Sequence, residues 1–205
     1  VEGDRVITIM TAGNLATTQA VVSLLNERSV IPADRKQTLL AAPTMFQVAR
    51  LVGDTLKEVI HSQAEEGQTA ESTFGATMIV GGQIRGMEPR LFLVYPEGNF
   101  IEASNETPFF QAGETKYGRP IILRAFDSAM SFEDAIKLLF VSFDSTLKAN
   151  LAVGMPLDLH AYRIDTFETG IQRRIPSDDP YFHAISSDWG NALKEAIDKL
   201  PDFTF

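Results

Sequence analysis

The sequence contains no cysteine, which excludes disulfides, cysteine nucleophiles and cysteine-based metal sites. Its three histidines, His61, His160 and His183, lack the spacing of metal ligands, so we expect no metal site and no Ser–His–Asp triad. Positive charge is scarce too: 18 Lys and Arg face 27 Asp and Glu. A net charge of −9 argues against nucleic acid or an anionic membrane as the partner.

Long apolar runs are also missing, so we expect a soluble protein that does not cross a membrane, and a cytoplasmic location fits best. The glycines Gly81, Gly82 and Gly86 do not form a dinucleotide fingerprint, because no helix follows them. The sequence therefore predicts no cofactor.

What is present suits one globular domain. The 205 residues are 44% hydrophobic and 22% charged, which is ordinary for a domain with a buried core, and we expect residues 1–205 to form a single domain. An apolar strand begins within five residues of Val1. We therefore expect that the natural protein has further residues before Val1.

Hydrophobic periodicity predicts helices and strands in groups. Helices are expected over Leu15–Arg28, from Thr44 to Gln63, from Ser131 to about Asn150 and over Ser187–Leu200, and strands over Arg5–Met10, Phe74–Val80, Arg90–Tyr95, Asn99–Ala103, Leu157–Tyr162 and Ile171–Ile175. Polar connections are expected over Ser29–Ala42 and Gln63–Glu71, and a loop over Asn105–Pro120. Grouped helices between hairpins favour an α+β fold with antiparallel sheets, arranged as a four-layer α/β/β/α sandwich.

Local signals support three of these elements. Val48, Val52, Leu56 and Val59 repeat at helical spacing and predict one buried stripe. The pairs Thr44 with Gln47 and Ser131 with Asp134 are typical of helix N-caps. Asp144 lies four residues before Lys148, the spacing of an ion pair on a helix.

The segment from Thr11 to Asn14 joins the first strand directly to the first helix. Glycine at position 13 lets backbone N–H groups approach a ligand, and the helix directs its positive end at the same place. Such a turn can bind an anion or an oxyanion. The local pattern by itself favours the simpler interpretation, in which Gly13 serves only the geometry of a tight turn.

A second polar segment runs from Gly113 to Gly118 and places Glu, Thr, Lys and Tyr between two glycines. It is as consistent with a functional loop as with simple loop geometry. Asn150 and Gly154 stand where the end of the third helix needs them.

Taken in order, these motifs resemble proteasome-type β subunits, which are N-terminal nucleophile hydrolases. The bacterial branch called the ancestral beta subunit, or Anbu, is the most similar. The resemblance rests on four segments: Thr11 to Asn14, Leu91 to Gly98, Gly113 to Gly118, and Ser131 to Ala135 followed by Gly154. It covers nearly the whole chain.

The resemblance implies a self-assembling threonine-type peptidase without a cofactor. An N-terminal Thr would attack the peptide carbonyl, and its α-amino group, which titrates near neutrality, would take the proton. The N–H of Gly13 would bind the oxyanion, while Thr11, Ala12 and Leu15 would border the substrate pocket. The partners implied are further copies of the chain, a peptide or unfolded-protein substrate, and an unfoldase whose identity stays open.

The sequence departs from the family at several places. Val1 offers no nucleophile, and the family's nucleophilic Thr and supporting Asp and Lys lie in two strands that these residues lack, so we expect those strands to be missing here. Glu114 replaces a Ser of the family, Asn150 stands where the family often has Asp, and Val153 stands where it often has Ser. These changes alter the shell of side chains that would support the nucleophile, to which Glu114 and Asn150 belong. Two alternatives stay open: a non-catalytic oligomeric scaffold of the same fold, and an amidase acting on small amides.

Overall fold

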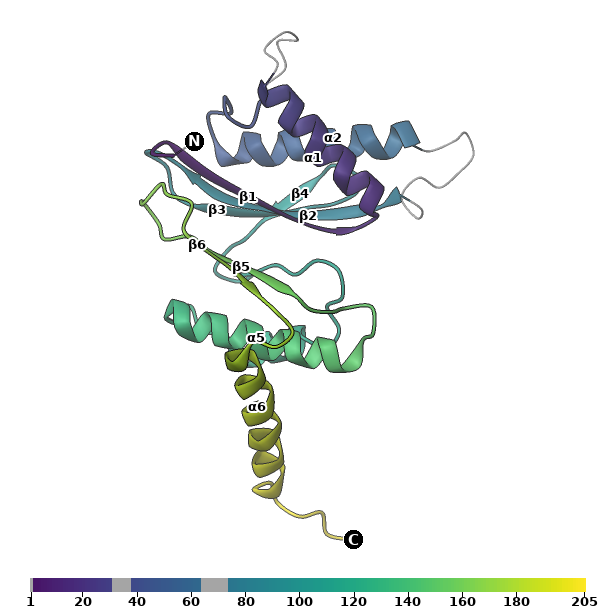
Figure 1. Cartoon of the computed structure of the whole chain (residues 1–205), viewed down its shortest axis with the longest axis vertical. Helices are drawn as coiled ribbons and strands as arrows, with labels where there is room; N and C mark the ends of the chain where they lie inside the picture. The colour runs from purple at the N-terminus through teal and green to yellow at the C-terminus, as the bar shows by residue number, and fades with distance from the viewer. Residues whose placement is uncertain (1, 31–37, 64–73) are drawn as a thin grey trace. The chain divides into compact units, whose positions relative to one another are not determined.

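The computed structural model describes residues 2–30, 38–63 and 74–205 (Figure 1). The chain forms two compact units. The first unit contains Val1–Gly113 and Tyr162–Gly170, and the second contains Glu114–Ala161 and Ile171–Phe205. The predicted connection 29–42 and the predicted solvated stretch 63–71 lie largely outside the described residues.

The first unit is an antiparallel sheet with two helices on one face (Figure 1). The strands follow the order β1-β2-β3-β4, and the elements are β1 (Arg5–Gly13), α1 (Leu15–Val30), α2 (Met45–Gln63), β2 (Ala76–Ile84), β3 (Arg90–Val94) and β4 (Phe100–Glu102). The predicted hairpin of β3 and β4 is confirmed, with Val94 opposite Phe100.

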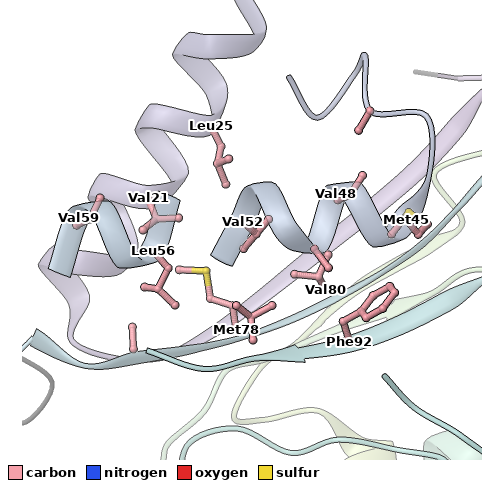
Figure 2. Packing of buried hydrophobic residues seen from close by; sticks show 14 of the residues in the cluster. Val21, Leu25, Met45, Val48, Val52, Leu56, Val59, Met78, Val80 and Phe92 are labelled. Carbon is pink, nitrogen blue, oxygen red and sulfur yellow. The ribbon is translucent and has the colours of Figure 1, made fainter. Parts of the chain in front are cut away.

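The core of the first unit lies between α2 and the sheet (Figure 2). The predicted stripe of α2 is confirmed, since the side chains of Val48, Val52, Leu56 and Val59 are all buried. They pack with residues of α1, β2 and β3, namely Val21, Leu25, Met78, Val80 and Phe92. Burying this apolar stripe is what holds the helix on the sheet, because each fully buried Val or Leu contributes about 1.5–3 kcal/mol.

The second unit contains a two-stranded sheet and three helices. Its elements are α4 (Arg119–Ala125), α5 (Phe132–Ala149), β5 (Leu157–Ala161), β6 (Ile171–Ile175) and α6 (Pro180–Asp198). Phe140 of α5 meets Phe182 of α6 edge to face, with ring centroids 5.6 Å apart. The Ser131 cap is confirmed, because its hydroxyl accepts a hydrogen bond from the N–H of Asp134 at 3.1 Å.

Several boundary predictions are wrong, and one of them is the end of the first strand, which runs past Met10 to Gly13. The strand expected to end at Val80 continues through Gly81 and Gly82, because β1 pairs with β2 as far as Ile84. The loop expected over Asn105–Pro120 ends in the short helix α4, whose first turn accommodates Pro120 because the N–H that proline lacks has no helical partner there.

The last helix begins at Pro180, seven residues before the expected Ser187, and ends at Asp198 instead of Leu200. Asp179 caps this helix: its carboxylate accepts a hydrogen bond from the N–H of Phe182 at 2.9 Å. The predicted α+β class with antiparallel sheets is confirmed. Among the described residues, no helix combines the length and the hydropathy needed to cross a membrane.

Candidate functional site

The strand-to-helix turn of the first unit ends β1 at Gly13 and begins α1 at Leu15. Gly13 lies opposite Ala76 of β2 and has a φ of 111°, in the region that favours glycine. A Cβ atom on Gly13 would lie 2.5 Å from the carbonyl oxygen of Gly75 and 2.9 Å from the Cα of Ala76. Glycine is therefore required here by both the backbone conformation and the close approach of β2.

The register of β1 and β2 determines where the N–H of Gly13 points. The next residue, Asn14, donates its N–H to the carbonyl oxygen of Gly75 at 2.9 Å. Antiparallel strands alternate between hydrogen-bonded and non-hydrogen-bonded residue pairs, so the pair of Gly13 and Ala76 is of the second kind. The N–H of Gly13 consequently points away from β2, at the edge of β1 that has no partner strand among the described residues.

The start of α1 is fixed by hydrogen bonds from both sides. The Oδ1 of Asn14 accepts a hydrogen bond from the N–H of Thr17 at 3.0 Å, as an N-cap does. The buried hydroxyl of Thr17 lies 3.0 Å from Oε1 of Gln63, in the last turn of α2, and donates to the carbonyl oxygen of Phe74 at 2.9 Å. The positive end of α1 is thus held beside the Gly13 turn.

The three predicted pocket residues lie around this turn. Thr11 and Leu15 are exposed, and Ala12 is half-buried. A Cβ atom on Gly113 would lie 3.4 Å from the Cβ of Ala12, so the polar loop that begins at Gly113 starts beside the turn. Gly75 and Gly113 were not assigned to the site from sequence, because their proximity to Gly13 and Ala12 follows from pairing and loop path alone.

In the second unit, the predicted supporting residues Glu114 and Asn150 contact each other. The Nδ2 of Asn150 donates to Oε2 of Glu114 at 3.0 Å, while Oε1 of Glu114 accepts the N–H of Lys116 at 2.8 Å. The backbone N–H of Lys116, and then the Asn150 amide and the Lys116 charge, hold the pKa of Glu114 below its usual value. Glu114 is therefore an anion at neutral pH, attached to the end of α5.

Asn150 uses both ends of its amide. Its Oδ1 accepts the N–H of Ala152 at 2.9 Å, and its backbone N–H donates to the carbonyl oxygen of Thr146. The loop from Gly113 ends tightly packed as well: a Cβ on Gly118 would collide with the side chain of Ser142 on α5. The segment from Gly113 to Gly118 therefore combines close packing against α5 with a charged side chain. Both interpretations that its sequence allows, a functional loop and simple loop geometry, remain compatible with this structure.

The comparisons with known proteins decide the family. No protein-family model and no curated protein matches the chain. Among solved structures, Anbu (ancestral beta-subunit) from Yersinia bercovieri is 41% identical, with a TM-score of 0.91, and the match covers 100% of this chain and 84% of that one. Anbu from Hyphomicrobium sp. strain MC1 is 47% identical with a TM-score of 0.92 and the same coverage.

The chain belongs to the Anbu family. A third member, described as the helical assembly of the Anbu complex from Pseudomonas aeruginosa, is 39% identical with a TM-score of 0.91, covering 100% of this chain and 83% of that one. The predicted resemblance is thereby confirmed, and the chain has the proteasome-like fold of N-terminal nucleophile hydrolases.

Within this Anbu chain, the roles assigned to Gly13, Thr11, Ala12, Leu15, Glu114 and Asn150 stay predictions. The described residues hold no group of three or more His, Asp or Glu side chains that could bind a metal ion. What the geometry offers chemically is an outward-pointing backbone N–H beside a helix N-terminus, which suits a developing negative charge on oxygen.

Proposed function

We propose that this Anbu chain is a subunit of a self-assembling threonine-type peptidase in which the N–H of Gly13 binds the oxyanion. The observation that carries the proposal is the β1–β2 register, which leaves this N–H outside the ladder at the N-terminus of α1. Oxyanion stabilisation by one such donor contributes about 10²–10³ in rate.

The nucleophile is assigned to residues outside these 205. The relatives support this assignment, because the match leaves 16–17% of their length without a counterpart in this chain. An N-terminal Thr hydroxyl attacks the peptide carbonyl carbon, and its proton passes to the α-amine. The C–N bond breaks, the leaving amine takes that proton, and water then hydrolyses the ester to release the second product.

The substrate is a peptide or an unfolded protein. An extended peptide running past the turn would place the side chain before the scissile bond among Thr11, Ala12 and Leu15, two of which are exposed. Self-assembly is proposed from the helical assembly of the Pseudomonas aeruginosa relative. We assign the protein to the cytoplasm, and its negative charge leaves nucleic acid an unsuitable partner.

The test uses the purified full-length protein and a series of fluorogenic peptides of increasing length. The proposal predicts turnover that requires an N-terminal Thr and falls at least about 100-fold when Gly13 is replaced by valine. Turnover that persists in the Gly13→Val variant would assign the turn a purely structural role. Turnover confined to single-residue amides would favour an amidase.

One observation favours a second candidate, a non-catalytic scaffold. Both ends of the Asn150 amide and both oxygens of Glu114 are engaged with each other or with backbone N–H groups. These bonds give both side chains a structural role at the end of α5, so a nucleophile is not needed to explain their positions. An assembled full-length protein that cleaves no peptide and resists N-terminal electrophiles would support the scaffold.

A further inference from the structure

Helix α6 carries an apolar stripe that extends beyond the hydrophobic core of its own unit. The stripe begins at Phe182, which is buried against α5, and continues at helical spacing through Trp189, Leu193 and Ile197, and the exposed Leu200 follows just after the helix ends. Every residue from position 191 onward is exposed, and Figure 1 shows the later turns of α6 running away from α5. The apolar stripe is thus buried at the N-terminal end of α6 and exposed to solvent at its C-terminal end.

The residues that follow α6 add two aromatic rings to this surface. Phe203 and Phe205 meet edge to face with centroids 5.2 Å apart, yet Phe203 keeps 80% of its surface exposed. We call Leu193, Ile197, Leu200, Phe203 and Phe205 the arm. At about 150–250 Å² for a fully buried aromatic side chain, the arm exposes on the order of 600 Å².

The size of this exposed apolar area indicates what kind of molecule could cover it. Monomers rarely expose apolar patches beyond a few hundred Å², whereas one side of a standard protein interface buries about 800 Å². The arm therefore supplies most of one side of a protein–protein interface. A small ligand is a poor occupant, because the arm is a convex helix face and not a cavity.

Three further apolar side chains are exposed on α4 and α5, two helices of the same unit that contact each other. Leu123, Leu139 and Phe143 are 62%, 41% and 42% exposed, and we call them the acceptor face. By helical spacing, Leu139 and Phe143 lie on the sector of α5 between Ser142, which contacts Gly118 before α4, and Phe140, which contacts α6. The acceptor face is thus bordered by two helices.

Basic charge borders the acceptor face on the α4 side, whereas α5 carries three acidic residues and two lysines. Helix α4 contains Arg119 and Arg124 and no acidic residue. The segment 193–205, which contains the arm, has three acidic residues and two lysines. Opposite charge at the rim of an apolar contact fixes its orientation more than its affinity.

We propose that the arm of one copy packs on the acceptor face of the next copy. This inference rests on the proposed self-assembly and names the surfaces that carry it. Arm and face are different surfaces, so the contact can be made in one direction, which adds copies, or exchanged reciprocally between two copies, which closes a dimer. We assign the one-directional arrangement, because by itself it extends an assembly, as in the helical assembly of the Pseudomonas aeruginosa relative, whereas a reciprocal exchange of arms would stop at a dimer.

The experiment measures the assembly of full-length protein by sedimentation velocity over a range of concentrations. The arm variant is Ile197→Glu with Phe203→Glu, and the face variant is Leu123→Glu. Each should move the self-association midpoint to a protein concentration at least about tenfold higher. Because all three side chains are exposed, folding should be unaffected, which circular dichroism checks; Phe203→Ser serves as a milder second arm variant.

The matched control is Met87→Glu, which alters a side chain that is 42% exposed in the other unit and should leave assembly unchanged. Mixing the arm variant with the face variant should restore one contact per pair and yield mixed dimers. Unchanged assembly in both variants, or no mixed dimers, would overturn the inference.

A parallel readout separates this inference from the proposed peptidase. Labelling of the N-terminus by an electrophilic peptide reports the peptidase, and sedimentation reports the contact. Normal labelling with unchanged assembly of both variants overturns the arm contact alone. Weakened assembly of both variants, with restoration on mixing, supports the contact whether or not the N-terminus is labelled.

Discussion

Gly13 lies so close to Gly75 that a Cβ atom on Gly13 would come within 2.5 Å of the Gly75 carbonyl oxygen. The same contact places Asn14 in hydrogen-bonding distance of Gly75 and directs the N–H of Gly13 to the outer edge of β1. A single strand register therefore explains both why glycine is needed and why its N–H is free of the ladder.

Replacing Gly13 by valine should abolish turnover. The φ of 111° and the Gly75 carbonyl force a side chain to displace the turn, and a misplaced oxyanion donor costs at least about 100-fold in kcat. The matched control is Gly82→Ala, in the same β1–β2 ladder, where a Cβ would collide with the carbonyl oxygen of Val6 at a φ of 155°.

Strain of this kind costs about 1–3 kcal/mol, so both variants should be less stable. Only the Gly13 variant should lose kcat per folded molecule, measured after correction for the folded fraction by urea titration. Equal loss of kcat in both variants would show that lost stability, and not the donor, explains the effect.

Removing the α1 cap should loosen the turn without abolishing it. Asn14→Ala deletes the acceptor for the N–H of Thr17, and losing such a cap costs about 1 kcal/mol. Asn14→Asp keeps the acceptor and should restore stability in thermal unfolding. An alanine variant as stable as the wild type would show that the cap contributes nothing here.

Stability should depend on pH through Glu114. Hydrogen bonds from Lys116 and Asn150 lower the pKa of this carboxyl, so its contribution is present above the unfolded-state pKa of about 4.3. That contribution is lost as the pH falls through the lower folded-state pKa. Urea titrations from pH 7 to pH 3 should show a steeper acid loss in the wild type than in Glu114→Gln.

Identical slopes for the wild type and Glu114→Gln would contradict the assigned role of the Asn150 and Lys116 hydrogen bonds.

Two ion pairs of α5 should differ in their contribution to stability. Nζ of Lys148 lies 2.9 Å from the carboxylate of Asp144, whose side chain is only 5% exposed, and also donates to Ser186 of α6. Lys148→Met leaves a buried carboxylate without its cation, which should cost about 1–3 kcal/mol. Lys137→Met breaks a pair with Asp134 in which both side chains are exposed, so it should lower stability much less.

Chemical denaturation of both variants tests this difference. The variant Lys148→Met with Asp144→Asn should recover part of the loss, because the unpaired charge is removed. Equal costs for the buried and the exposed pair would contradict the assignment.

Local sequence signals predicted the structure correctly where the interacting residues lie close together in the chain. The spacing of Asp144 and Lys148 predicted their ion pair, and Ser131 predicted the start of α5. The stripe of α2 needed only helical periodicity. Such features are readable from sequence because their partners lie within one or two helical turns.

The predictions failed where the local structure depends on contacts with a segment that is distant in the sequence. Gly81 and Gly82 normally end a strand, but the close approach of β1 makes residues without a Cβ fit inside the ladder. The start of α6 was expected at Ser187, although Asp179 caps the helix and Pro180 is its first residue. At the site, the Gly13 turn was visible, but the direction of its N–H depends on register with Gly75, which no local pattern encodes.

The central claim is that Gly13 serves an N-terminal threonine nucleophile. The most direct measurement treats purified full-length protein with a peptide β-lactone and locates the adduct by intact mass and peptide mapping. The account predicts one acyl group on the hydroxyl of an N-terminal threonine, and much slower labelling of the Gly13→Val variant. An assembled, folded protein that acquires no adduct at its N-terminus would contradict it.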